Sequence, residues 1–140
     1  MAEVAAIALD IGRKRIGVAG CDRLGLIASP IATIERQSFE QDVATLRAIA
    51  QERQATVLVA GLPLTMDGED SAQTRHARKW AKRYATAIGL PFVLVDERLS
   101  SVEAEELLRS RGQQPSRDKG SIDRYAAAAI LQRWLDEQQI

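Results

Sequence analysis

The sequence predicts an α/β protein in which a mixed β-sheet is covered by helices, and three observations support this prediction. Short apolar runs rich in Val, Ile and Leu alternate with segments that carry apolar residues at helical spacing. The first two apolar runs are joined by a short basic turn, which is typical of an antiparallel hairpin. Helical segments separate the later strands, and this order favours a layered α/β arrangement.

The elements follow one another in the order βββαβαβαα. Residues 4–10 and 15–21 form the predicted hairpin, and residues 26–34 form a third strand that Pro30 restricts to a sheet edge or a bulge. The other predicted strands are 56–60 and 92–95, and the predicted helices are 40–53, 71–88, 101–110 and 121–137.

Composition and length narrow the class of protein. A chain of 140 residues with 46% hydrophobic residues matches one globular domain, residues 1–140. It contains no apolar run near the ~20 residues that a membrane-spanning helix needs, and no secretory signal pattern. A single cysteine, Cys21, favours a cytoplasmic location. The absence of a Gly-x-Gly-x-x-Gly turn after a strand argues against a Rossmann dehydrogenase.

Asp10 is the first residue that calls for a functional explanation. It lies near the end of the apolar strand 4–10 and directly before the basic turn 13–15. A carboxylate inside such a strand is unfavourable to bury unless it has a partner. A metal ion or a phosphate network would supply that partner.

Two further acidic residues occupy places where ligands bind. Glu97 follows the strand 92–95, and open α/β sheets bind ligands at the carboxyl ends of their strands. Asp123 opens the last helix and lies on or beside an apolar stripe that includes Ala127 and Ile130. Structural alternatives remain open at this stage: a salt bridge with Arg98 or another basic residue for Glu97, and helix capping for Asp123.

The spacing of these acids along the chain cannot show whether they meet. If the fold brings Asp10, Glu97 and Asp123 together, three carboxylates form a hard-oxygen site suited to Mg²⁺ or Mn²⁺. Such ions activate water and stabilise the leaving oxygen of a phosphodiester.

Basic residues gather in patches although the net charge is zero. One face of the helix 71–88 carries Arg75, Arg78, Lys79, Lys82 and Arg83, and a solvated helix face explains it as well as an anion-binding role does. His76, the only histidine, is interpreted as a surface residue or phosphate contact rather than a metal ligand. The candidate substrate-binding residues are Arg13, Lys14, Arg15, Arg75, Arg78, Lys79, Lys82 and Lys119.

Four segments together resemble the YqgF/RuvX family of Holliday-junction resolvase-like or pre-16S rRNA nuclease proteins of bacteria. They are residues 10–19 (DIGRKRIGVA), 61–68 (GLPLTMDG), 96–101 (DERLSS) and 119–123 (KGSID), in family order. The resemblance implies a ribonuclease H-like fold: a five-stranded mixed sheet of order 3-2-1-4-5 with helices on both faces. The sequence differs from the family at Thr65, where Asn is frequent.

The resemblance also implies a metal-dependent nuclease acting on structured nucleic acid, with 5′-end maturation of pre-16S rRNA as the leading role. It places the catalytic and metal-binding acids at Asp10, Glu97 and Asp123. Many ribonuclease H-like nucleases carry an acid at the end of the fourth strand, but Gly61 follows the strand here, so Glu97 must supply the second carboxylate. Ribosomal precursor particles are candidate partners, and the protein is expected to be a monomer or homodimer.

Three alternative functions stay open. The enzyme could be a Holliday-junction resolvase that acts on branched DNA, or the chain could be a non-catalytic RNA-binding or transcription-associated factor. The strand–turn–strand around Asp10 is also similar to the first phosphate motif of actin-like ATPases, but those enzymes close two such domains around a nucleotide.

Overall fold

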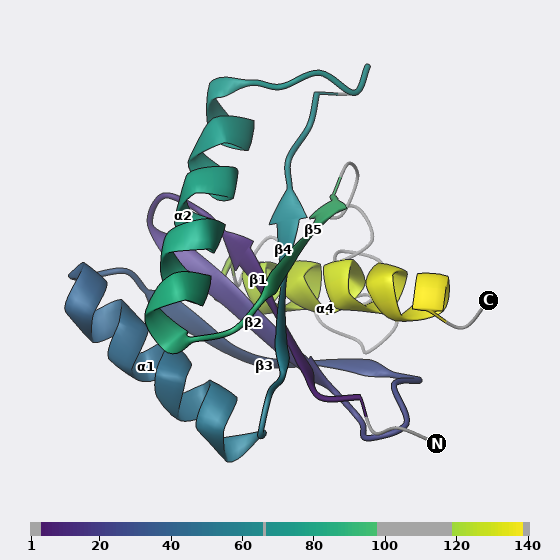
Figure 1. Cartoon of the computed structure of the whole chain (residues 1–140). Helices are drawn as coiled ribbons and strands as arrows, with labels where there is room; N and C mark the ends of the chain where they lie inside the picture. Colours follow the sequence, from purple (N-terminus) through teal and green to yellow (C-terminus); the bar gives the residue numbers. More distant parts are fainter. Residues whose placement is uncertain (1–3, 66, 98–118, 139–140) are drawn as a thin grey trace.

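The computed structural model describes residues 4–65, 67–97 and 119–138, which form a five-stranded sheet with helices on both faces (Figure 1). The strands are β1 (Ala6–Ile11), β2 (Arg15–Cys21), β3 (Ala28–Glu35), β4 (Val57–Leu62) and β5 (Phe92–Asp96), and the helices are α1 (Phe39–Glu52), α2 (Ala72–Ile88) and α4 (Lys119–Gln138). The predicted helix 101–110 lies outside the described residues. Every other predicted element is present, with ends that differ by at most two residues.

The strand order in the sheet is β3-β2-β1-β4-β5, which confirms the predicted order. β2 pairs antiparallel with both β1 and β3, whereas β4 pairs parallel with both β1 and β5. The carboxyl ends of β1, β4 and β5 therefore meet at one edge of the sheet.

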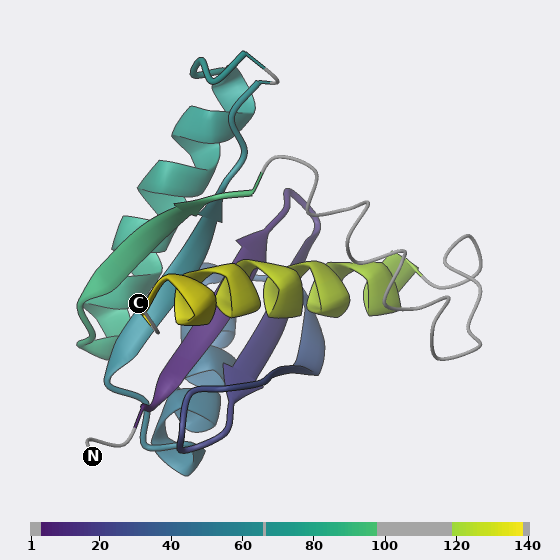
Figure 2. The ribbon, with the colours of Figure 1, turned by 90° about the vertical axis from the view of Figure 1, so that its right-hand side faces the viewer.

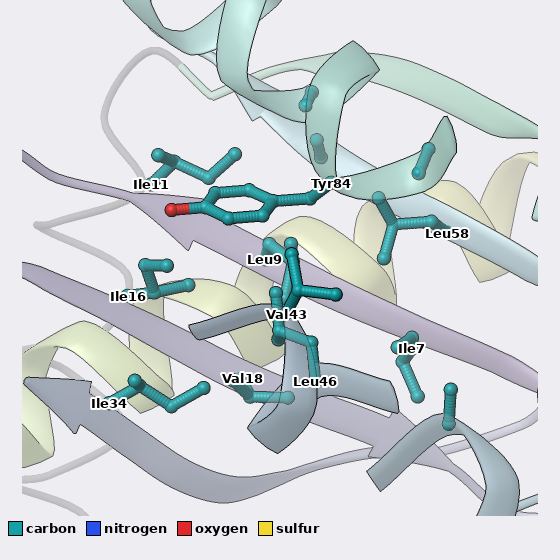
Figure 3. Close-up of a cluster of buried hydrophobic side chains, with 14 residues drawn as sticks. Ile7, Leu9, Ile11, Ile16, Val18, Ile34, Val43, Leu46, Leu58 and Tyr84 are labelled. Atoms are coloured by element: carbon teal, nitrogen blue, oxygen red, sulfur yellow. The ribbon is translucent and has the colours of Figure 1, made fainter. Parts of the chain in front are cut away.

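The two faces of the sheet bury different sets of side chains because successive residues of a strand point to opposite faces. On β1, Ile7, Leu9 and Ile11 pack with residues of α1 and α2, whereas Ala6 and Ala8 pack with residues of α4. Figure 3 shows the ring of Tyr84, from α2, lying over the first of these faces. Figures 1 and 2 show α1 and α2 on one side of the sheet and α4 across the other. By this alternation Asp10 belongs to the α4 face.

Pro30 lies both in an edge strand and beside a bulge, the two positions predicted for it. β3 is an edge strand, and its register with β2 shifts, because Val18 pairs with Ala32 and Ala19 pairs with Pro30. Ile31 is therefore the extra residue of a bulge. The strand begins later than the expected residue 26 because the Asp22 carboxylate accepts hydrogen bonds from the two backbone N–H groups of residues 26 and 27.

Local signals set the ends of α2, whereas small side chains set the packing of α4 on the sheet. α2 begins with a capping box between Ser71 and Thr74 and ends at Gly89, whose φ of 78° lies in the left-handed region. α4 carries four consecutive alanines, residues 126–129, which are all buried. Small side chains let α4 lie close to the sheet. Within the described part of the chain, no helix is long and apolar enough to cross a membrane.

Candidate active site

The carboxyl groups of Asp10 and Glu97 form a hydrogen-bonded pair at the carboxyl ends of β1 and β5. A bond between two carboxyl groups requires that one of them holds a proton. Burial raises the pKa of Asp10 to about 6, the hydrogen bond from Glu97 opposes this shift, and the negative charge of Asp123 adds to it. The pair therefore favours a positive charge, either a proton or a cation, between its oxygens.

Asp123 approaches this pair from the first turns of α4. Its Oδ2 atom accepts a hydrogen bond from Nε of Arg15, at 2.7 Å, and the two groups form a half-exposed ion pair. The fold thus brings Asp123 close enough to affect Asp10, and the basic hairpin residue Arg15 holds the Asp123 carboxylate in place.

Two glycines make room for these carboxylates. Gly17 of β2 is paired with Asp10, and a Cβ atom there would lie 1.9 Å from the backbone oxygen of Asp123. Gly61 of β4 follows Ala60, the partner of Leu9. A Cβ atom at Gly61 would lie 2.7 Å from the carboxyl carbon of Glu97. Helix α4 can therefore touch the sheet at Gly17, and the Glu97 side chain occupies the space above Gly61.

This arrangement explains why the end of β4 carries no acid. In the sequence alone, Gly61 is only a departure from the usual ribonuclease H-like pattern, whereas the structure gives it a spatial role. The signal that could have identified it is a residue without a side chain beside a strand that carries a half-buried carboxylate.

The donor chemistry of the pair fits a hard divalent cation. Asp10 and Glu97 offer only carboxylate oxygens, which Mg²⁺ and Mn²⁺ prefer, and a cation would remove the need for a shared proton. Within the described ranges, however, no three Asp, Glu, His or Cys side chains are already grouped closely enough to hold an ion. Asp123 would have to turn from Arg15 toward the pair to become a third ligand.

The predicted substrate-binding residues fall into three groups. Arg13 and Lys14 are exposed in the turn between β1 and β2, next to Asp10, whereas Arg15 is engaged with Asp123. On α2, Arg75, Lys79 and Lys82 are exposed, but Arg78 forms an ion pair with Asp70, at 2.9 Å. Lys119 lies at the start of α4, and its side chain is outside the described residues.

Sequence reasoning missed Arg36. Its Nη1 atom donates a hydrogen bond of 2.6 Å to the carbonyl oxygen of Gly12 and lies 3.2 Å from Nε2 of His76. Arg36 follows β3 in the chain, so nothing in the local sequence connects it with the turn after Asp10. His76 lies against Arg36 and the Trp80 ring.

A surface cavity of about 630 Å³ lies at the other end of the sheet, where Cys21, Arg53 and Thr56 are among its lining residues. None of the three acids lines this cavity. Its position away from the carboxyl ends of the parallel strands separates it from the candidate active site.

Comparison with solved structures supports the fold. A Thermus thermophilus RuvC in complex with a Holliday junction substrate matches with a TM-score of 0.64 and 13% identity, over 97% of this chain and 96% of that one. The large terminase nuclease from the thermophilic phage G20c matches with a TM-score of 0.55 and 13% identity, over 92% and 81% of the two chains. A second structure of that terminase nuclease contains bound zinc.

Comparison with known sequences gives the family. A protein of Synechococcus elongatus named "Putative pre-16S rRNA nuclease" is 56% identical over 135 residues, which cover 96% of this chain and 91% of the relative. A protein of the same name from Crocosphaera subtropica is 52% identical over 139 residues, covering 99% and 97%. The family model described as "RuvX: Holliday junction resolvase" matches residues 4–137. The chain therefore belongs to the RuvX family.

Proposed function

We propose that this protein is a divalent-metal-dependent nuclease that hydrolyses phosphodiester bonds in structured nucleic acid. The observation that carries the proposal is the Asp10–Glu97 carboxyl pair at the carboxyl ends of parallel strands, with Asp123 beside it. Names of relatives more than 50% identical over nearly the whole chain support pre-16S rRNA as the substrate, and that substrate favours the cytoplasm as the location.

In this proposal Asp10 and Glu97 would hold Mg²⁺ or Mn²⁺, and Asp123 would be the third ligand. A bound ion lowers the pKa of water and stabilises the charge that develops on the leaving oxygen. Arg15 would hold Asp123 beside the pair through the 2.7 Å hydrogen bond, from which the carboxylate would turn to reach the ion. Arg13 and Lys14, exposed in the adjacent turn, hold the phosphate next to the bond that is cut.

A second candidate substrate is a four-way DNA junction. The description of the family model favours it, since that description is Holliday junction resolvase. The same acid pair would serve either substrate, because metal-assisted hydrolysis acts on the phosphodiester group that RNA and DNA share.

The test is cleavage of a pre-16S rRNA fragment and of a four-way DNA junction by the purified protein, with Mg²⁺, Mn²⁺ or EDTA. The variant is Asp10→Asn, which preserves the shape of the side chain and removes its charge. The matched control is Asp136→Asn, which makes the same change on an exposed residue about 20 Å along α4 from Asp123.

We expect metal-dependent cleavage by the wild type and by Asp136→Asn, and none by Asp10→Asn. The preferred substrate then decides between rRNA maturation and junction resolution. Equal cleavage by wild type and Asp10→Asn would indicate a contaminating nuclease. RNA binding without cleavage by any form would instead favour a non-catalytic RNA-binding factor.

A further inference from the structure

Three aromatic rings form a cluster on the face of the sheet opposite Asp10. Phe39 begins α1, and Trp80 and Tyr84 lie one turn apart on α2. Their ring centroids are 6.0 Å (Phe39–Trp80), 5.7 Å (Phe39–Tyr84) and 5.6 Å (Trp80–Tyr84) apart. Tyr84 is buried, whereas Phe39 and Trp80 are partly exposed. The outer part of the ring cluster therefore lies at the protein surface.

Cationic side chains lie against these two outer rings. The guanidinium carbon of Arg83 is 4.4 Å from the Trp80 centroid and 4.6 Å from the Phe39 centroid. That of Arg36 is 4.8 Å from Trp80, and the Lys79 ammonium is 5.9 Å from the same ring. We call Arg36, Lys79 and Arg83, with the neighbouring His76, the cation cluster. A guanidinium that packs on a ring keeps N–H donors at its edge, where they can bind phosphate oxygens.

The cation cluster adjoins the turn that follows Asp10. Arg36 donates a hydrogen bond to the Gly12 carbonyl, and Nε2 of His76 lies 3.2 Å from Arg36. The His76 and Trp80 ring centroids are 6.1 Å apart, with the rings tilted by 50°. The exposed Arg13 is close enough to lower the pKa of His76, as are Arg36 and Lys79, although burial is the larger cause. Positive side chains thus extend from the turn beside the acid pair onto the outer surface of α2.

No ion pair of the described residues involves Arg36, His76, Lys79 or Arg83. The ion pairs Arg15–Asp123 and Arg78–Asp70 engage other basic residues. The Asp42 carboxylate lies beneath the rings, but it is buried and accepts hydrogen bonds from the Gln37 backbone and the Tyr84 hydroxyl. Adjacent cations repel one another, so an anion on this surface would be stabilised by several positive charges at once.

We propose that the cation cluster is a second phosphodiester-binding site, which holds the nucleic-acid strand that flanks the bond cut at the acid pair. This inference rests on the proposed nuclease function. A linear polyanion fits the observations because the positive groups continue from the cluster to Arg13 in the turn. The faces of Trp80 and Phe39 carry guanidinium groups, so the site contacts the backbone of the nucleic acid rather than stacking on its bases.

Binding can be measured apart from cleavage. A short fluorescein-labelled RNA hairpin is titrated with the full-length protein in EDTA, and fluorescence anisotropy gives Kd at several salt concentrations. The main variant is Arg83→Gln, because Arg83 is exposed and its loss should leave the fold intact. The control is Arg23→Gln, which removes the same charge from an exposed residue beyond the opposite end of β2.

We expect Arg83→Gln to raise Kd by about five- to tenfold and to reduce the slope of log K against log salt by about 1, the value for one lost phosphate contact. Arg23→Gln should leave Kd within about twofold of the wild type, as is usual for a charge that contacts no phosphate. Arg83→Lys retains the charge but lacks the planar group, so its Kd should lie between these values.

His76 gives an independent readout because it is the only histidine in the chain. Its ring signals in a proton NMR spectrum should shift when the RNA hairpin is added to the wild type in EDTA. Bound RNA with an unmoved His76 signal and equal Kd values for Arg83→Gln and Arg23→Gln would overturn the second site. That result would not affect the nuclease proposal. If the wild type binds RNA through the cation cluster but cleaves no substrate, only the nuclease proposal is contradicted.

Discussion

The Asp10 carboxylate lowers the free energy of unfolding when it is ionised. Its pKa is raised from 3.8 to about 6, mainly by burial. Between these two pH values the folded chain retains a proton that the unfolded chain releases. The free energy of unfolding therefore falls as the pH rises through this interval, and the loss is complete above about pH 6.

The first prediction concerns this pH dependence. Asp10→Asn has no charge to bury, so its free energy of unfolding should exceed that of the wild type by up to about 3 kcal/mol at neutral pH. The difference should disappear below about pH 4, where the carboxyl group is protonated in both states. Urea unfolding in EDTA across this pH range measures it. Asp136→Asn serves as control, and parallel curves for wild type and Asp10→Asn would contradict the prediction.

The second prediction concerns the space above Gly61. Gly61→Ala places a methyl group 2.7 Å from the Glu97 carboxyl carbon and 2.5 Å from the Cδ1 atom of Ile130. Both atoms end flexible side chains that can turn away, so the free energy of unfolding should fall by only about 1 kcal/mol. Cleavage should nevertheless fall sharply, because Glu97 can no longer pair with Asp10. Parallel cleavage and urea-unfolding assays measure both effects, and full activity in this variant would argue against a role for the pair.

At the scale of secondary-structure elements, the contact between α4 and β2 positions Asp123. Gly17 lets the backbone of the first turns of α4 lie directly against the sheet, and the four buried alanines continue that close packing along the helix. Side-chain movement cannot relieve a clash at Gly17, because the opposing atom is the backbone oxygen of Asp123.

Gly17→Ala is therefore the third prediction, and its expected effect differs from that of Gly61→Ala. The new methyl group would lie 1.9 Å from the Asp123 oxygen, so α4 must move away from β2. We expect a loss of about 3 kcal/mol or more in the free energy of unfolding, together with loss of cleavage. Thermal unfolding followed by circular dichroism provides the measurement. A variant as stable as Gly61→Ala would show that α4 is packed less tightly than described.

At the scale of the whole molecule, a bound cation should couple the active site to global stability. An ion that binds only the folded chain stabilises it by about 1.4 kcal/mol at ten times its Kd, which corresponds to a rise of a few degrees in Tm. We predict this rise for the wild type with Mg²⁺ or Mn²⁺, and its loss in Glu97→Gln. Differential scanning fluorimetry against an EDTA baseline measures it, with Asp136→Asn as control. Equal shifts in wild type and Glu97→Gln would place the ion elsewhere.

The sequence predicted the architecture because its signals are local. Helical periodicity and apolar runs gave the described elements to within two residues, and the family resemblance gave the order of the strands. The late start of β3 has a physical cause, since apolar periodicity at Leu26 and Ile27 cannot reveal the hydrogen bonds that the Asp22 carboxylate accepts from their backbone.

The details of the site could not be predicted in the same way because they depend on tertiary packing. Asp10 and Glu97 are far apart in sequence, and their pairing follows from two parallel strand contacts through β4. The hydrogen bond from Arg15 to Asp123 and the packing of Arg36 on Trp80 likewise join elements that no sequence period relates. The three acids were identified as candidates, but the role of the residues around them was not.

The two glycines beside Asp10 have a consequence for recognising inactive relatives of this protein. The usual test for an active nuclease in a sequence alignment is whether its acidic residues are present. A relative with all three acids and a side chain at the position of Gly61 would pass that test, yet its Glu97 equivalent would have no room beside the first carboxylate. In this fold, the absence of a side chain at the position of Gly61 therefore indicates nuclease activity as much as the presence of the carboxylates does.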